Sequence, residues 1–455
     1  MSAGLDVNGR RALVLGLGRF TGGVETVRYL RARGADVVVS DVATRTDLEA
    51  SAREVESLGA VLVFGRQTPA LLEDIDLVVA NPAIPFDHEV LRAADDRSLP
   101  VTTEMNLFLE RVRAPVLAVT GTKGKSTTVT LLAGMLEAAG RTVHLGGNVG
   151  RSLIARVDEI APRDLVVLEL SSFQLYWTRR IERSPHLTVV TNLFGDHLDR
   201  HGTFDHYAAS KRAALDAQGP GDVAVLPVDD ADVREAGYLD AGAARRVLFG
   251  AGGAYRLEGA TILGPRDLRV ELGGFPLWGP HNLRNALAAA AAALQAEGVG
   301  PEHVRAGALA ARPLPHRLAP VGEVDGVLYV DDSNGTNPTS TRCALEASPR
   351  PAVVLVGGKS KGLDLEPLLD TLAARARAVV GIGTTGPDVV RRLAGRVQAV
   401  DGGPTMETAV RAAAALARPG DAVLLSPAFS SLDQYASFVV RGRAFQDAVA
   451  ALTSA

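Results

Sequence analysis

The sequence predicts an α/β protein of three consecutive units, each built on a mostly parallel sheet. Three observations lead to this fold class. Short runs rich in Val, Leu and Ala alternate with helix-like segments along most of the 455 residues. Glycine-rich turns join strands to helices, and a proline-rich stretch at residues 311–315 separates the last unit from the rest. Apolar strands that alternate with helices are typical of parallel sheets covered on both faces.

The first unit contains the strand and helix patterns of a parallel sheet. Strands are expected at residues 11–16, 35–40 and 77–80, and a helix at residues 22–33. Gly16 and Gly18, followed by Gly22-Gly23 and by Asp41 after the second strand, resemble a dinucleotide-binding fingerprint, but the third glycine is misplaced. A dehydrogenase that binds NAD here therefore stays open as an alternative.

The second and third units repeat the alternation. The second has expected strands at 116–120, 164–170 and 187–191, helices at 125–139, 204–217 and 281–296, and a glycine-rich, antiparallel excursion within 241–279. Gly140 suits the left-handed end of the first of these helices. The third unit has expected strands at 327–330, 352–356, 378–382 and 421–425.

The turn at residues 121–126 predicts a phosphate site. Val119 stands where a strict phosphate-loop motif has its first glycine, so the loop is a shorter version of that motif. Its glycines let backbone N–H groups point at phosphate oxygens, and the helix that follows favours negative charge at its first turn. Lys125 reaches the terminal phosphates, and Ser126 or Thr127 can hold Mg²⁺. An ordinary strand–helix turn is the less favoured alternative.

Acidic and basic residues follow the next two strands. Glu169 ends one strand, at the edge where ligands bind in open α/β sheets, and a carboxylate there often holds Mg²⁺. Asp196, His197, Asp199 and His201 follow the next strand and suggest a metal or phosphate site. Sequence physics alone predicts Lys211 to be a surface residue of its helix.

Composition narrows the class of protein. The net charge is −4, from 48 basic and 52 acidic residues, which disfavours a nucleic-acid or membrane-surface protein. Cys343 is the single cysteine, so no intramolecular disulfide can form. No signal-peptide core begins the sequence, and the apolar run at 286–294 is too short to span a bilayer. A soluble, cytoplasmic protein is expected.

Nine motifs in a fixed order carry a resemblance to a known family. They are 120–128 (TGTKGKSTT), 146–150 (GGNVG), 169–175 (ELSSFQL), 192–200 (NLFGDHLDR), 281–286 (HNLRNA), 314–317 (LPHR), 331–338 (DDSNGTNP), 357–362 (GGKSKG) and 425–434 (LSPAFSSLDQ). The chain resembles the Mur ligases nearly end to end, and most closely their D-glutamate-adding members.

The resemblance implies a fold and an activity. It implies an N-terminal Rossmann-like domain at 1–105 for the UDP-substrate, a central P-loop ATPase-like domain at 106–313, and a C-terminal Rossmann-like domain at 314–455 for the amino acid. The implied reaction joins D-glutamate to UDP-N-acetylmuramoyl-L-alanine through an acyl phosphate, with ATP and two Mg²⁺ ions, in peptidoglycan precursor synthesis. That pathway serves cell-wall biogenesis, cell shape and division. A monomer without nucleic-acid or membrane partners is implied.

The resemblance also implies roles for individual residues. The catalytic group is Lys125, Glu169, His197 and Lys211. The ATP-binding set is Gly121, Thr122, Lys123, Gly124, Lys125, Ser126, Thr127, Asn282, Asn285, Arg317 and Asp332. The metal ligands are Ser126 and Glu169 for one ion, and His197 and a carbamylated Lys211 for the other. The muramoyl-side residues are Asn148, Ser171 and Gln174, and the amino-acid residues are Lys361, Ser431, Leu432 and Phe438.

The chain departs from the family pattern at two places. Asn334 stands where the family often has a lysine, and Lys359 or Lys361 is a nearby candidate to replace it. The uracil side matches only at Gly16, Gly18, Asp41 and the Asn81-Pro82 turn. Two other functions stay open beside the dehydrogenase: another amide ligase of the superfamily, such as a folylpolyglutamate synthase, and a nucleotide-binding protein without catalytic activity.

Overall fold

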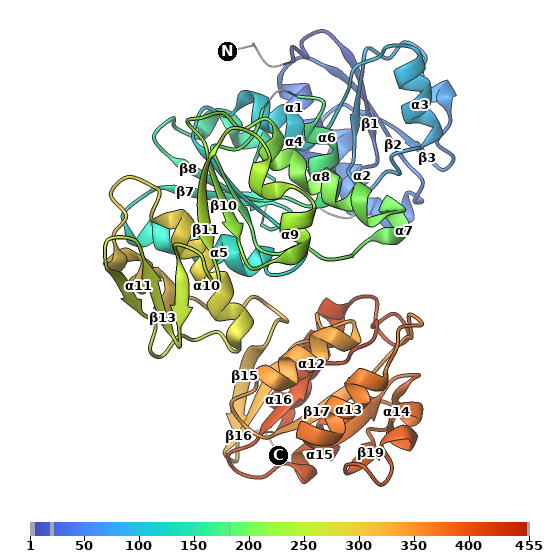
Figure 1. Cartoon of the computed structure of the whole chain (residues 1–455). Helices are drawn as coiled ribbons and strands as arrows, with labels where there is room; N and C mark the ends of the chain where they lie inside the picture. Colours follow the sequence, from blue (N-terminus) through green and yellow to red (C-terminus); the bar gives the residue numbers. More distant parts are fainter. Residues whose placement is uncertain (1–4, 19–21, 151, 182, 453–455) are drawn as a thin grey trace. The chain divides into compact units, whose positions relative to one another are not determined.

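The computed structural model describes residues 5–18, 22–150, 152–181 and 183–452. The chain divides into two compact units. The first unit, residues 1–273 with 284–309, contains the first two predicted sheets, and the second unit, residues 274–283 with 310–455, contains the third. The described residues form three sheets that are wholly or mostly parallel and one small antiparallel sheet (Figure 1). The predicted α/β class is confirmed, while the three domain boundaries stay a prediction.

Five parallel strands form the first sheet, in the order β3-β2-β1-β4-β5. The strands are β1 (Arg11–Leu15), β2 (Asp36–Asp41), β3 (Val61–Phe64), β4 (Leu77–Ala80) and β5 (Val101–Thr102). The helices are α1 (Gly22–Ala32), α2 (Glu49–Ser57), α3 (Glu89–Asp96) and α4 (Glu104–Arg111), with short 3₁₀ turns η1 (Thr46–Leu48) and η2 (Pro69–Leu72). Successive side chains of a strand point to opposite faces, so Val14 packs with α1 and Leu15 packs with α3.

Six parallel strands form the second sheet, in the order β11-β10-β9-β6-β8-β7. The strands are β6 (Val116–Thr120), β7 (Val143–Gly147), β8 (Leu165–Glu169), β9 (Leu187–Val190), β10 (Val223–Pro227) and β11 (Arg245–Phe249). The helical segments are α5 (Lys125–Ala138), η3 (Ile154–Glu159), α6 (Ser172–Thr178), α7 (Leu198–His201), α8 (Phe204–Asp216), α9 (Ala231–Glu235), η4 (Tyr238–Asp240), α10 (Pro280–Ala293) and α11 (Pro301–Leu309).

The antiparallel excursion expected within 241–279 is a three-stranded sheet in the order β12-β13-β14. Its strands are β12 (Arg256–Glu258), β13 (Thr261–Gly264) and β14 (Leu268–Glu271). Short connections between neighbouring strands permit this pairing, whereas parallel neighbours need a longer crossover. The expectation is wrong for residues 245–249, which form β11 and pair in parallel with β10.

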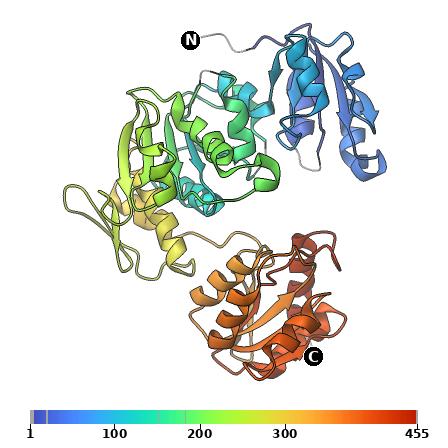
Figure 2. The ribbon, with the colours of Figure 1, turned by 45° about the vertical axis from the view of Figure 1, so that its right-hand side comes forward.

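The second unit is built on one six-stranded sheet, in the order β15-β16-β20-β17-β18-β19. The strands are β15 (Ala319–Val324), β16 (Val327–Asp331), β17 (Ala352–Gly357), β18 (Ala376–Ile382), β19 (Ala399–Asp401) and β20 (Ala422–Leu425). The helices are α12 (Pro338–Ala347), α13 (Glu366–Arg375), α14 (Gly386–Leu393), α15 (Met406–Leu416) and α16 (Phe438–Leu452). Helices cover both faces of this sheet (Figure 2). Only β15 is antiparallel to its neighbour.

The ends of several helices are set by capping residues that can be recognised in the sequence. Gly140 has φ +74° just after α5, as the predicted left-handed end requires. Asn337 caps α12 by accepting a hydrogen bond from the Ser340 N–H at 2.9 Å, and Pro338 is the first helical residue. Thr203 caps α8 in the same way through the His206 N–H. The stretch at 311–315 is not helical, as its prolines predict.

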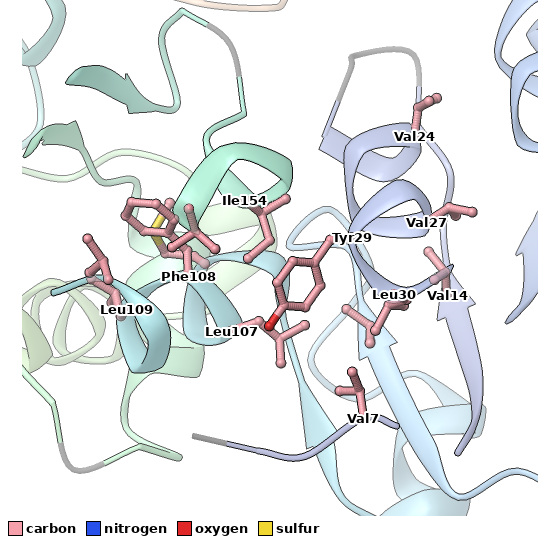
Figure 3. Packing of buried hydrophobic residues seen from close by; sticks show 14 of the residues in the cluster. Val7, Val14, Val24, Val27, Tyr29, Leu30, Leu107, Phe108, Leu109 and Ile154 are labelled. Atoms are coloured by element: carbon pink, nitrogen blue, oxygen red, sulfur yellow. The ribbon is translucent and has the colours of Figure 1, made fainter. Parts of the chain in front are cut away.

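One hydrophobic core joins the first sheet to the second within the first unit. Tyr29 of α1, Leu107 and Phe108 of α4, and Ile154 of η3 belong to a single buried cluster (Figure 3). Each of them is at most 1 % exposed. Packing across these elements therefore fixes the first sheet against the phosphate-loop sheet.

None of the described helices combines the length and apolarity needed to cross a membrane.

Phe108→Ala tests this shared core. Removing the ring leaves a cavity, so we expect the free energy of unfolding of the first unit to fall by about 3–5 kcal/mol. Urea unfolding followed by circular dichroism measures it. Val61→Ala is the control, because Val61 is 59 % exposed and its loss should change stability by no more than about 0.5 kcal/mol. Equal destabilisation by both substitutions would contradict the shared core.

Candidate active site

The loop between β6 and α5 has a backbone that only glycine accommodates at two positions. Gly121 has φ +133° and Gly124 has φ +83°. A Cβ on Gly121 would lie 2.1 Å from Thr191 Oγ1, and a Cβ on Gly124 would lie 2.3 Å from Asn285 Oδ1. Both glycines are thus required by conformation and by close approach of neighbouring segments, which leaves the loop backbone open for phosphate oxygens.

The end of β9 fixes the loop in place. Asn192 Oδ1 accepts a hydrogen bond from the Lys123 N–H at 2.9 Å, and its Nδ2 donates to Lys123 O at 3.0 Å. Thr191 Oγ1 donates to the same carbonyl at 2.7 Å. The Thr122 N–H donates to Asn192 O at 3.0 Å. These four hydrogen bonds tie the loop to the end of β9.

Two lysine amines converge on one carbonyl of the loop. Lys211 Nζ donates to Gly121 O at 2.8 Å, and Lys125 Nζ donates to the same oxygen at 3.1 Å and to Thr122 O at 3.0 Å. Lys211 is only 2 % exposed, so the expectation of a surface lysine is wrong. Burial, and then the charge of Lys125, hold the pKa of the Lys211 amine well below its usual range. Burial thus favours the neutral form of the Lys211 amine, which lies beside the amine of Lys125.

Glu169 at the end of β8 is also buried, at 2 % exposure, rather than facing solvent. Its Oε1 accepts a hydrogen bond from Asn148 Nδ2 at 2.8 Å, and its backbone carbonyl accepts from the Asn148 N–H at 2.8 Å. Among the described residues, no donor reaches its Oε2, although that atom is buried. A buried carboxylate oxygen without a donor suits a cation. The structure thus brings the predicted Asn148 and Glu169 together.

His197 lies at the start of α7 with φ +53° and a half-exposed side chain. Burial and the nearby lysines lower the pKa of its imidazole, and Asp196 only partly opposes them. Asp196 forms an ion pair with Lys123 at 2.9 Å. His197 is therefore held as a neutral imidazole, the form that binds metals.

The four acidic and histidine side chains that follow β9 do not converge. His201 is buried, and its Nε2 lies 3.0 Å from Ser172 Oγ while its Nδ1 lies 3.0 Å from His206 Nδ1. Asp199 is exposed. Within the described ranges, no group of three or more His, Cys, Asp and Glu side chains is arranged to hold a metal. Of the predicted metal ligands, only Glu169 and His197 are of these types.

Ser171 and Gln174 have a local role that the sequence analysis missed. Ser171 Oγ accepts a hydrogen bond from the Gln174 N–H at 3.2 Å, while Gln174 Oε1 accepts from the Ser171 N–H at 3.0 Å. This is a capping box at the start of α6. The spacing of three residues between Ser171 and Gln174 is typical of a capping box and could have predicted it. The cap holds both side chains at the end of β8, next to Glu169.

A contact between the first two sheets was also missed. Arg200 of α7 donates to Pro82 O at 3.4 Å and to Ile84 O, in the turn after β4. Its guanidinium also lies 5.3 Å from the ring centre of Phe86 and 5.4 Å from that of Phe173. Arg200 therefore ties the predicted Asn81-Pro82 turn to the segment that carries His197.

The first-domain residues matched to the uracil side lie together at the end of β1. Asp41 Oδ2 accepts a hydrogen bond from the Gly18 N–H at 3.0 Å. A Cβ on Gly16 would lie 2.9 Å from Asn81 Cβ. The remaining residues of the glycine-rich turn, 19–21, lie outside the described residues.

Helix α10 carries the two asparagines expected near the nucleotide. Asn285 is 7 % exposed and lies against the phosphate-loop glycine described above. Asn282 Nδ2 donates to Trp278 O at 2.7 Å. Arg284, which the sequence analysis did not single out, forms two hydrogen bonds to Asp229 at 2.9 and 2.6 Å. This pair anchors the helix to the end of β10.

In the second unit, the predicted Asp332 follows β16 and is buried. Its Oδ2 accepts a hydrogen bond from Ser426 Oγ at 2.7 Å and its Oδ1 accepts from the Leu318 N–H at 3.3 Å. Burial raises the pKa of its carboxyl group to about 7. Arg317 is exposed. Asn334 donates its N–H to His316 O at 3.0 Å, so its contact here is made by the backbone.

The residues matched to the amino-acid side follow neighbouring strands of the same sheet. Lys361, after β17, donates from Nζ to Thr336 O at 3.1 Å. Ser431 is buried and Leu432 is 61 % exposed, both after β20, and Phe438 begins α16. Ligands of open α/β sheets bind at this edge, beyond the carboxyl ends of the strands.

A parallel sheet with a glycine loop, two lysines and a buried glutamate at its carboxyl edge defines the class of nucleotide-binding α/β enzymes. Models of three protein families match the chain: "Mur ligase MurD-like, N-terminal domain" at residues 10–103, "Mur ligase middle domain" at 119–293, and "Mur ligase, glutamate ligase domain" at 316–429. The chain belongs to the Mur ligase family.

Individual relatives and solved structures agree with this assignment. A UDP-N-acetylmuramoylalanine–D-glutamate ligase of Pelotomaculum thermopropionicum is 38% identical, over 98% of this chain and 99% of that protein. One of Symbiobacterium thermophilum is 38% identical, over 97% and 98%. A UDP-N-acetylmuramate-alanine ligase of Thermotoga maritima shares the fold with a TM-score of 0.60, at 20% identity over 98% of this chain and 99% of that one.

Asp332→Asn tests the raised pKa of the buried carboxyl group through the pH dependence of stability. Its pKa is about 7 in the folded chain against an ordinary 3.8, so the folded state binds more protons between these values and stability falls as pH rises. The unfolding free energy of the wild type relative to Asp332→Asn should fall by roughly 1.4 kcal/mol per pH unit in this window. Urea unfolding from pH 4 to pH 8 measures it. Asp447→Asn, at an exposed aspartate, is the control. A difference that is flat with pH would contradict the assignment.

Proposed function

We propose that the chain is an ATP-dependent ligase that joins D-glutamate to UDP-N-acetylmuramoyl-L-alanine, forming an amide with release of ADP and phosphate. The observation that carries the proposal is the similarity, along nearly the whole chain, to relatives named for this reaction. The product is a peptidoglycan precursor. We also propose that the chain acts in the cytoplasm as a monomer.

The chemistry requires activation of a carboxylate, which is a poor electrophile. A carboxylate oxygen of the alanyl group attacks the γ-phosphorus of ATP, so a P–O bond forms and ADP leaves. The amine of D-glutamate then attacks the carbonyl carbon of the acyl phosphate, phosphate leaves, and the nitrogen loses a proton. Negative groups must be brought together for the first step, so charge neutralisation and positioning dominate the catalysis.

The phosphate loop supplies both the charge neutralisation and the positioning. The backbone N–H groups at the start of α5 and the cationic Lys125 bind the phosphates. Because the loop is already held by the β9 segment, little ordering is needed when ATP binds. Asn282, Asn285, Arg317 and Asp332 are proposed to contact the nucleotide. Asn148, Ser171 and Gln174 are proposed for the muramoyl substrate, and Lys361, Ser431, Leu432 and Phe438 for D-glutamate.

The residues of this site fit Mg²⁺. The buried Oε2 of Glu169 accepts no hydrogen bond from the described residues, and the imidazole of His197 is neutral. Ser126 and Glu169 would hold one ion, and His197 and a carbamylated Lys211 the other. Bound Mg²⁺ neutralises phosphate charge and fixes the orientation of the transferred group.

Lys211 meets the chemical requirement for carbamylation. Only a neutral amine attacks CO₂; the nitrogen bonds to the carbon and releases a proton, which leaves a carbamate. Burial, and then the charge of Lys125, lower the pKa of Lys211 and so favour the neutral amine. The product is a carboxylate-like ligand whose negative charge is attracted to Lys125.

The experiment that tests the function is a phosphate-release assay with UDP-N-acetylmuramoyl-L-alanine and a panel of amino acids. Only D-glutamate should stimulate release, against L-glutamate, L-alanine, a diamino acid and D-alanyl-D-alanine. Lys125→Ala should abolish the signal, because the phosphates lose their cation. Stimulation by L-glutamate with a folate acceptor would favour a polyglutamate ligase instead.

Lys211→Ala with added formate or acetate tests the carbamate. We expect activity to fall by about 10²–10³-fold, as for loss of one electrostatic stabiliser of a transition state. A short carboxylate should restore part of it by occupying the vacated position. Lys125→Ala is the matched control, because a carboxylate cannot replace a cation. Failure to rescue, or equal stimulation of both variants, would contradict carbamylation.

A further inference from the structure

Arg441 of α16 is a fully buried cation that none of the roles above uses. It is 1 % exposed. Its Nε donates to Ser333 Oγ at 3.0 Å, its Nη2 to Ser333 O at 2.9 Å, and its Nη1 to Phe429 O at 3.1 Å. All three acceptors are neutral oxygens. Among the described residues, Arg441 forms no ion pair within 4.0 Å.

A buried charge of this kind is unfavourable for folding alone. Taking a guanidinium out of water costs free energy that neutral acceptors only partly return, and an apolar side chain of similar size usually fills such a position at no loss. Burial accordingly lowers the pKa of Arg441 to about 10, so the group still carries its charge at neutral pH. The position therefore calls for a function that needs a cation.

The guanidinium connects the segments that follow two neighbouring strands. Ser333 follows β16, and its Oγ also donates to Phe438 O at 2.8 Å. Phe429 follows β20 and leads directly into the Ser430–Leu432 turn. That turn pairs with the segment after β17, because the Lys359 N–H donates to Ser430 O at 2.8 Å. One side chain thus sets the spacing between the segments proposed to contact the amino acid.

The charge of Arg441 also opposes a local excess of acid. Asp331, Asp332 and Asp433 are the carboxylates that interact electrostatically with it. Asp331 is completely buried, and its Oδ2 lies 2.7 Å from His316 Nδ1 and 2.9 Å from Gln446 Nε2. A dicarboxylate that binds at these strand ends would be repelled by those of the aspartates that are ionised. The positive charge of Arg441 offsets that repulsion.

We propose that Arg441 is a positioning residue for amino-acid binding: it holds the segments that begin at Ser333 and Phe429, and it supplies positive charge that favours a dicarboxylic amino acid. The inference rests on the proposed function. It assigns to Arg441 a part in selecting the acidic substrate without contact to it.

Two substitutions separate geometry from charge in the full-length chain. Arg441→Lys keeps the charge but cannot reach three acceptors, and Arg441→Gln keeps two donors but removes the charge. We expect KM for D-glutamate to rise about tenfold in the first variant and about 100-fold in the second. KM for the UDP-substrate should stay within about twofold, because the residues proposed to bind it, Asn148, Ser171 and Gln174, belong to the first unit and do not depend on this hydrogen-bond set.

Arg377→Gln is the matched control. Arg377, on β18, forms an ion pair with the buried Asp421 just before β20, at the opposite end of the same strands. Its loss should lower the melting temperature and leave KM for D-glutamate unchanged. If Arg441→Gln does not fold, Arg441→Lys decides the question, with its melting temperature measured alongside.

The outcomes are distinct. A selective rise in KM for D-glutamate supports the proposal. An unchanged KM for D-glutamate with a lower melting temperature, or an equal rise in KM for D-glutamate and for the UDP-substrate, overturns it. Failure of the proposed function would be visible in the wild-type chain, which would then not release phosphate in response to D-glutamate.

Discussion

The candidate site depends on the convergence of Lys125 and Lys211 on the carbonyl oxygen of Gly121. Burial, and then the positive charge of Lys125, lower the pKa of the Lys211 amine and so favour its neutral form, although the carboxylates of Asp196 and Glu169 oppose this shift. This division of roles gives the loop a cation for phosphate and, a few ångströms away, a nucleophilic amine. The neighbouring β9 segment and the glycines fix the carbonyl, and through it both amines.

Burial also shifts the pKa of charged groups in the second unit, of an acid as well as of a base. Asp332 is buried with few donors, and its pKa rises accordingly. Arg441 is buried with no carboxylate of the described residues within ion-pair distance, and its pKa falls. Both groups lie just beyond the carboxyl ends of β16 and its neighbours, where an open α/β sheet binds ligands. Folding tolerates these charges because backbone and hydroxyl groups satisfy their hydrogen bonds. The shifted pKa values show that burial disfavours the charged forms of both groups. We infer that these positions serve to bind charged ligands.

The sequence predicted the apolar central strands well, because a continuous Val- and Leu-rich run has one interpretation in an α/β chain. It missed the edge strands of the three large sheets, because composition does not reveal an edge strand that its partner stabilises; these are β3, β5, β7, β11, β15 and β19. It also missed β10, which lies inside the second sheet. The phosphate loop and Glu169 were predictable from local pattern. The burial of Lys211 was not, since it arises from packing of α8 against a loop 90 residues away. The sequence analysis also failed to identify three arginines, because each of them forms contacts with partners that are distant in sequence; these are Arg200, Arg284 and Arg441.

The central claim is that this site activates a carboxylate by transferring phosphate to it. Isotope transfer tests that most directly. UDP-N-acetylmuramoyl-L-alanine labelled with ¹⁸O in its terminal carboxylate is incubated with the enzyme, ATP, Mg²⁺ and D-glutamate, and the released phosphate is analysed by mass spectrometry. An acyl phosphate requires one labelled oxygen to leave with the phosphate. Released phosphate without the label, alongside normal amide formation, would contradict the account.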